Sequence, residues 1–187
     1  MKFKFVICLL AVVALAACSN NRAALKPAEL RKPAPPFQLK DAEGKQVSLA
    51  DYKDKVVLVN FWATWCNPCR VEIPWFADFE RQYKDQGFAV LGISLDEHGW
   101  KDINPFVDEY KLNYKVLLGT EELSNLYGVE ALPMTYMIDR EGRLAAIHRG
   151  LMRKATYEDE IKGLLNAPAH AAASMGSGAL LALRAGN

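Results

Sequence analysis

The chain has 187 residues and a formal net charge of +1, and no block of like charge stands out. Apolar residues make up 51% and charged residues 24% of it, which is typical of a soluble globular protein with one core of ordinary size. This near-neutral balance does not favour nucleic acid or another polyanion as a partner.

Residues 1–17 have the pattern of a signal peptide. Lys2 and Lys4 precede an apolar run that is too short to span a bilayer comfortably. The run ends in Leu15-Ala16-Ala17-Cys18, which resembles the bacterial lipoprotein box, where the signal is cut before a cysteine that carries a lipid. The alternative is an ordinary secretory signal that happens to contain a cysteine.

With Cys18 lipidated, we expect a membrane-anchored lipoprotein that faces the periplasm or another extracytoplasmic space. Ser19 stands where an aspartate usually retains such lipoproteins in the inner membrane, so this rule favours the outer membrane. Cys8 leaves with the signal, and Cys66 and Cys69 then remain as the only free thiols. They lie in a compartment where disulfides form and persist.

One α/β domain is expected after the signal. Residues 18–36 are rich in proline and are predicted to form a flexible tether behind the lipidated cysteine. The domain is predicted over 37–166, and the alanine- and glycine-rich residues 167–187 are expected to be a disordered tail.

Within the domain, strands and helices are expected to alternate. A hairpin is predicted over 37–49, and continuous apolar runs predict buried strands at 56–61 and 88–94. Apolar residues at spacings of three and four predict a helix over 68–86, which Pro74 should kink. This order predicts a mixed sheet with helices on both faces. The other elements expected are helices at 100–110, 121–127 and 154–165 and strands at 114–118, 135–138 and 144–148.

Four kinds of chemistry use a cysteine pair such as Trp65-Cys66-Asn67-Pro68-Cys69. Covalent haem needs a histidine directly after the second cysteine, where this chain has Arg70. A structural disulfide that closes so short a loop removes little chain entropy. Zinc needs further ligands, so neither a metal nor another cofactor is expected. The histidines are scattered and lack ligand spacing: His98, His148 and His170.

Thiol–disulfide exchange is left, and the position of the pair suits it. The helix is expected to begin at Pro68, because a missing N–H costs nothing in the first turn. Cys66 then lies at the helix N-terminus, where unpaired N–H groups and the helix dipole favour its thiolate. Cys69, one turn further on, is expected to be shielded and to resolve a mixed disulfide on Cys66.

Two motifs resemble the thioredoxin family. Residues 61–69, FWATWCNPC, are similar to its active-site stretch, and residues 131–135, ALPMT, resemble the loop that carries its cis-proline. The lipid box, the hairpin and the insert at 111–129 are most similar to the membrane-tethered TlpA/ResA-like branch of redoxin-type thiol–disulfide oxidoreductases. The resemblance implies a thioredoxin-like three-layer sandwich with an N-terminal β-hairpin extension. It also implies a cis bond before Pro133 and pairing of the Leu132 backbone with an extended substrate chain.

Further roles around the pair follow from the resemblance. Thioredoxin has a buried aspartate where this chain has Asn60, which cannot titrate. Glu72, one helical turn after Cys69, is therefore expected to tune the pKa of the thiols or to move their proton. The alternative for Glu72 is an exposed carboxylate near the helix N-terminus. Trp65 is expected to contact substrate beside the thiols, and a partly buried core aromatic is the alternative.

The sequence therefore predicts an extracytoplasmic enzyme that reduces protein disulfides by exchange at Cys66 and Cys69. Its expected partners are an oxidised client, for example apocytochrome c, and a membrane electron-donor protein, and the enzyme itself is expected to be a monomer. Asn67 and Pro68, between the cysteines, are expected to tune the redox potential. The alternatives are a disulfide-introducing oxidant and a redoxin-type thiol peroxidase. The proline-x-x-x-threonine-x-x-cysteine pattern of peroxidatic cysteines is absent, because Val59 and Ala63 occupy its first two positions.

Overall fold

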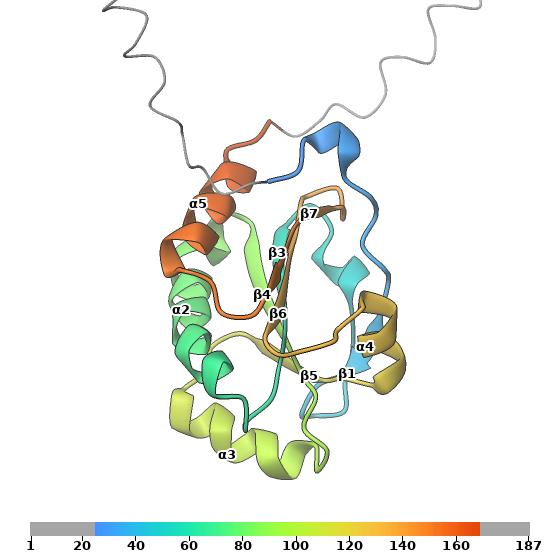
Figure 1. Ribbon diagram of the computed structural model, residues 1–187, viewed down its shortest axis with the longest axis vertical. Coiled ribbons are helices and arrows are strands. Elements are labelled where there is room, and N and C mark those ends of the chain that lie inside the picture. The colour runs from blue at the N-terminus through green and yellow to red at the C-terminus, as the bar shows by residue number, and fades with distance from the viewer. Residues whose placement is uncertain (1–24, 169–187) are drawn as a thin grey trace, which may run out of the picture.

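The computed structural model describes residues 25–168, which fold into a three-layer α/β sandwich (Figure 1). The middle layer is a five-stranded sheet with the order β5-β4-β3-β6-β7. β3, β4 and β5 run parallel to one another. β6 runs antiparallel to β3, and β7 runs antiparallel to β6. The strands are β3 (Val56–Trp62), β4 (Phe88–Ser94), β5 (Lys115–Leu118), β6 (Met134–Ile138) and β7 (Leu144–Arg149).

Both faces of the sheet are covered (Figure 1). One face carries α2 (Asn67–Tyr83), α3 (Trp100–Tyr110) and α5 (Lys154–Leu165). The opposite face carries α4 (Glu121–Tyr127) and the hairpin of β1 (Gln38–Lys40) and β2 (Gln46–Ser48). The predicted mixed sheet, the helices on both faces and the N-terminal hairpin are therefore confirmed. The chain also contains three short 3₁₀ helices among its described residues: η2 (Ala28–Leu30), η3 (Leu49–Tyr52) and η4 (Lys84–Gln86).

The continuous apolar runs form the two central strands, as predicted. Every residue of β3 and β4 is buried, because each strand has a strand on both sides and a covering layer on both faces. The two strands pair in parallel from Val56 opposite Phe88 to Trp62 opposite Ser94. Their carboxyl ends therefore lie side by side, and the loops that follow them meet at one edge of the sheet.

Helix α2 follows β3 and forms one long wall of the core. Its apolar stripe, which includes Ile73, Phe76 and Phe79, is fully buried. The helix passes through Pro74 without a break and ends at Tyr83, three residues before the predicted end. Those last residues form η4, and Gly87 then takes the left-handed conformation (φ 86°) that reverses the chain into β4.

The N-terminal segment from residue 26 to 36 packs against the domain, although a tether was predicted up to residue 36. Lys26 N–H donates to Ala145 O at 2.8 Å, and Ala34 N–H donates to Gly142 O at 2.9 Å. Prolines limit the regular structure of this segment to the single turn η2, but other N–H and C=O groups of the segment bond to the neighbouring hairpin. The ordered domain therefore begins about ten residues before the predicted start at residue 37.

No helix within residues 25–168 combines the length and the apolar character needed to cross a membrane. The predicted signal, the lipidation site Cys18 with Ser19, and the tail beyond residue 168 lie outside the described residues.

Candidate active site

Cys66 and Cys69 lie where β3 leads into α2 and are joined by a disulfide with an S–S distance of 2.02 Å. Cys66 is the N-cap residue of α2, with extended backbone angles (φ −81°, ψ 102°). Its Sγ accepts a hydrogen bond from the Cys69 N–H at 3.3 Å. After reduction, this N–H group and the positive end of the helix dipole stabilise a thiolate on Cys66.

The residues around the pair differ in exposure. Cys66 retains 4% of its surface and Cys69 none, so only Cys66 offers a partner any access. Asn67 and Pro68, between them, are exposed. Trp65 is 66% exposed, so the alternative of a core aromatic is wrong. Its indole forms an exposed apolar surface directly before Cys66 in the chain.

The loop before β6 contains a cis peptide bond between Leu132 and Pro133. Pro133 O accepts a hydrogen bond from the Gly150 N–H at 2.8 Å, which fixes one side of this loop to the end of β7. β6 pairs with β3 so that Met134 lies opposite Phe61, near the end of β3 that leads to the cysteines. No described residue hydrogen-bonds to the N–H or C=O of Leu132.

Glu72 lies one helical turn after Cys69, on the buried side of α2, and is fully buried. Asn60 Nδ2 donates to Glu72 Oε1 at 2.8 Å, and the Tyr157 hydroxyl donates to Oε2 at 3.0 Å. Asn60 Nδ2 also donates to Thr135 Oγ1 at 3.0 Å. The alternative of an exposed helix carboxylate is therefore wrong.

The environment of Glu72 makes it titrate near neutrality. Burial raises the pKa of this carboxyl from 4.5 to about 7, against the opposing effect of the hydrogen bonds from Tyr157 and Asn60. A carboxyl with this pKa exchanges its proton readily at neutral pH, as a general acid or base must. Asn60 orients Glu72 through the hydrogen bond from its Nδ2.

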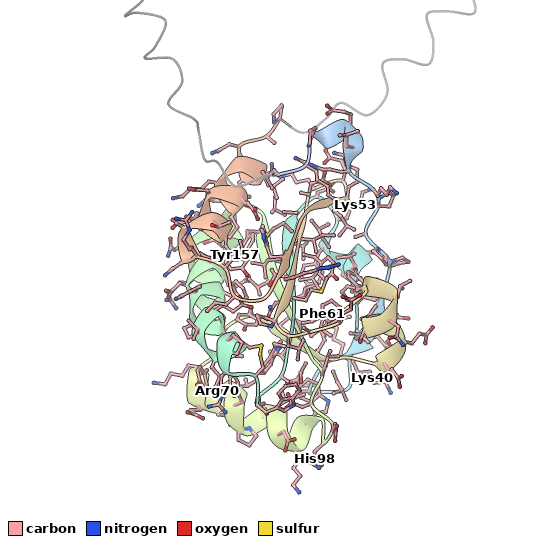
Figure 2. The ribbon with its side chains drawn as sticks, viewed as in Figure 1. Lys40, Lys53, Phe61, Arg70, His98 and Tyr157 are labelled. Carbon is pink, nitrogen blue, oxygen red and sulfur yellow. A yellow bond between two sulfur atoms is a disulfide. The ribbon has the colours of Figure 1, made fainter. Side chains whose placement is uncertain are left out.

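Sequence reasoning missed Tyr157 and Thr135, which complete the surroundings of Glu72. In Figure 2, Tyr157 lies on the α2 side of the sheet, where its ring packs in the core cluster beneath α5. The apolar stripe of α5 could have placed Tyr157 inward, since Ile161 and Leu164 follow at helical spacing. Its hydroxyl reaches Glu72 only through the packing of α5 against α2, which no local pattern encodes.

The histidines play other parts. His98 is exposed and bonds to Asp102, one turn further along, at 2.9 Å. His148, on β7, bonds to the buried Glu160 at 2.8 Å. Over residues 25–168, no three histidine, cysteine or acidic side chains gather in a way that could hold a metal ion.

This arrangement suits reversible formation of the Cys66–Cys69 disulfide. The fold and the site together define a thiol–disulfide oxidoreductase with a thioredoxin-like fold. The chain belongs to the AhpC/TSA family, whose model matches residues 30–147.

Known proteins similar to this chain agree with that class. Thioredoxin-like protein YneN of Bacillus subtilis (strain 168) is 38% identical over 130 residues, which cover 68% of this chain and 76% of YneN. Thiol-disulfide oxidoreductase ResA of the same organism is 35% identical over 127 residues, or 67% and 70% of the two chains. A solved thiol:disulfide interchange protein of the thioredoxin family from Chlorobium tepidum TLS has a TM-score of 0.67 at 30% identity, covering 72% of this chain and 97% of that one. The predicted resemblance and enzyme class are confirmed.

Proposed function

We propose that this protein reduces disulfides of client proteins outside the cytoplasm, with Cys66 as the attacking and Cys69 as the resolving thiol. The observation that carries the proposal is the order of the three groups along α2. Cys66 caps the helix with a trace of exposed surface, whereas Cys69 and Glu72 are completely buried behind it. One thiol can meet a client, and the other can react only with the first.

The reaction transfers two electrons to the client in two exchange steps. The Cys66 thiolate attacks one client sulfur, so the client disulfide breaks, a Cys66–client disulfide forms, and the other client sulfur leaves as a thiolate that takes up a proton. Cys69 gives its proton to the Glu72 carboxylate and attacks Cys66 Sγ. The Cys66–Cys69 disulfide forms, and the second client sulfur leaves as a thiolate and is protonated. A dithiol donor protein then reduces the enzyme by the reverse sequence.

The neighbouring residues are assigned supporting roles in this reaction. The Leu132 N–H and C=O, beside the cis bond to Pro133, pair with an extended segment of the client. Trp65 supplies an exposed apolar contact next to the attacking sulfur. Asn67 and Pro68, which are exposed between the cysteines, tune the potential of the pair.

The proposal includes a lipid anchor at Cys18 and a site that points away from the membrane. Figure 1 shows both ends of the described chain at the end of the molecule opposite to the start of α2. An anchor that precedes residue 25 therefore joins the domain far from the thiols. Apocytochrome c before haem attachment is a suitable client, and a membrane protein is the donor. A Cys18→Ser variant that still fractionates with membranes would contradict the anchor.

Trapping of the mixed disulfide tests the proposed function. Reduced Cys69→Ser protein should form a lasting covalent adduct with oxidised insulin, because the resolving thiol is gone, and Cys66→Ser protein should form none. The wild type should reduce insulin without accumulating an adduct. Equal trapping by both variants, or by neither, would contradict the assigned roles.

A further inference from the structure

Asp96 is a buried carboxylate that holds the turn before Cys66 and that the proposed reaction leaves unused. It follows β4 and is only 4% exposed. Its Oδ1 accepts from the Thr64 hydroxyl at 2.6 Å and from the Thr64 N–H at 3.1 Å. Its Oδ2 accepts from the same N–H at 3.0 Å and from the Ser94 hydroxyl at 2.7 Å. Both oxygens are therefore engaged, and Thr64 supplies most of the bonds.

The backbone C=O of Thr64 is held as well as its N–H. Arg70 Nε donates to Thr64 O at 2.8 Å, and its guanidinium lies 5.3 Å from the centre of the Phe106 ring. In Figure 2, Arg70 lies at the start of α2, beside α3. Asp96 and Arg70 thus fix the N–H and the C=O of one residue from two different elements.

The rest of the turn is fixed at both ends. Cys66 N–H donates to Ala63 O at 3.1 Å, and Leu95 N–H donates to Trp62 O at 2.9 Å. The bond from Leu95 to Trp62 continues the pairing of β4 with β3 one residue beyond Ser94. Asp96, the next residue, is thereby brought next to the turn. The backbone that carries Trp65 and Cys66 is consequently held from Trp62 onward.

The chemistry of the site favours a carboxylate at position 96. Within residues 25–168, Asp96 forms no ion pair, and hydrogen bonds to both of its oxygens compensate its burial. The donors to its two oxygens are Thr64 and Ser94, and the backbone N–H of Asp96 bonds in turn to Ser94 Oγ at 3.1 Å. An amide of the same shape offers a single acceptor oxygen, so it would leave a donor of Thr64 or Ser94 facing an NH₂ group.

We propose that Asp96 is a positioning residue, which fixes the Trp62–Cys66 turn and so sets how Cys66 Sγ and the exposed Trp65 meet a client disulfide. The inference rests on the proposed function. Attack on a disulfide requires the incoming sulfur to align with the two sulfurs of the client, and a held backbone maintains that alignment without reorganisation. A loosened turn keeps the thiol but presents it in many directions.

Four single variants of the full chain test this role. Asp96→Asn keeps the shape of the carboxylate and removes one acceptor, and Thr64→Val removes the donor hydroxyl. Thr64→Ser restores that hydroxyl and serves as the rescue variant. Asp102→Asn is the matched control, because Asp102 bonds to the exposed His98. The measured quantity is the second-order rate at which each reduced protein attacks the disulfide of 5,5′-dithiobis(2-nitrobenzoate), together with the melting temperature of each oxidised protein.

The expected result is a rate about fivefold lower or more for Asp96→Asn and Thr64→Val, as the loss of one charge-assisted hydrogen bond implies. Thr64→Ser and Asp102→Asn should stay within about twofold of the wild type, and the double variant Asp96→Asn/Thr64→Val should be no slower than its slower parent. If Asp96→Asn does not fold, Thr64→Val against Thr64→Ser decides alone.

Rates within about twofold of the wild type for both Asp96→Asn and Thr64→Val would overturn the positioning role, as would equal slowing by Thr64→Val and Thr64→Ser. A wild-type protein that attacks no disulfide at all would instead contradict the proposed function.

Discussion

At the residue scale, the chemistry depends on how Glu72 is buried. Its place one helical turn after Cys69 follows from the spacing of the sequence. Its environment is built by packing: Glu72 lies on α2, and its partners Asn60 and Tyr157 come from β3 and α5. The consequence is a carboxyl that is neutral for part of the physiological pH range, which an exposed helix carboxylate is not.

Replacing Glu72 with Gln should stabilise the oxidised protein at high pH. The pKa of Glu72 is raised by burial from 4.5 to about 7, so the folded state binds its proton more tightly than the unfolded state does. The ionised carboxylate therefore lowers stability progressively as the pH rises from about 4.5 to about 7, by up to about 3 kcal/mol. Denaturant unfolding of both proteins should show Glu72→Gln to be more stable at pH 8 and nearly equal at pH 4. Equal stability at pH 8 would contradict the raised pKa.

Replacing Tyr157 with Phe should raise the pKa of Glu72 further. The Tyr157 hydroxyl donates to Glu72 Oε2 and favours the ionised form, so its loss favours the protonated form. An NMR titration of the Glu72 carboxyl in the oxidised protein measures the change directly. Tyr136→Phe is the matched control, because the Tyr136 hydroxyl is also buried but donates to Tyr127 O. The same titration curve in Tyr157→Phe and wild type would refute the contact.

At the element scale, the site is built where β3 and β4 end together. Gly119, directly after β5, closes this edge, and its N–H donates to Ser94 O at 2.8 Å. A Cβ on Gly119 would lie 2.7 Å from Leu95 Cδ2 and 2.9 Å from the backbone oxygen of Ser94. The absence of a side chain at position 119 lets β5 approach the segment that carries Asp96.

Replacing Gly119 with Ala should lower the free energy of unfolding by about 1–3 kcal/mol, because backbone has to move to make room. Gly163→Ala in α5 is the control, since its Cβ would meet only the side chain of Leu25, at 3.2 Å. That change should stay within about 1 kcal/mol. Urea unfolding of both variants decides, and equal effects would argue against a close approach at Gly119.

Most of the elements could be predicted because local patterns determine them. The apolar runs of β3 and β4 and the stripe of α2 fix their type, and the helices α3, α4 and α5 begin and end as predicted. The candidate site was predictable as far as the cysteines, the place of Glu72 one turn after Cys69, and the cis bond before Pro133. The contacts of Asp96 with Thr64 and of Tyr157 with Glu72 join residues 32 and 85 positions apart, and no local pattern reports such pairs.

At the scale of the whole molecule, the N-terminal segment is tied to the hairpin of β6 and β7. Asp139 binds Arg31 at 3.1 Å and Arg143 at 2.9 Å. Burial alone would raise the pKa of Asp139, but hydrogen bonds from the Arg143 backbone and from both guanidinium groups outweigh it and lower the pKa. The stability that Asp139 contributes is therefore present above the unfolded pKa near 3.8 and is lost as the pH falls through the lower folded value.

A chain that begins at residue 37 should be less stable than one that begins at Leu25. It lacks the hydrogen bonds of residues 26–36 to the hairpin and the ion pair of Arg31 with Asp139. The expected loss is about 2–4 kcal/mol at neutral pH, from several hydrogen bonds of about 1 kcal/mol each. Unfolding of the two purified chains measures it. Equal stability would mean that residues 25–36 are a tether after all.

The reduction potential of the Cys66–Cys69 couple tests the central claim most directly. The full chain is equilibrated with thiol redox buffers of known potential, and the fraction of free thiols is read by alkylation. An enzyme that reduces client disulfides should give a value near that of thioredoxin, roughly −270 mV. A value nearer −120 mV would mark an oxidant that introduces disulfides and would contradict the proposed direction.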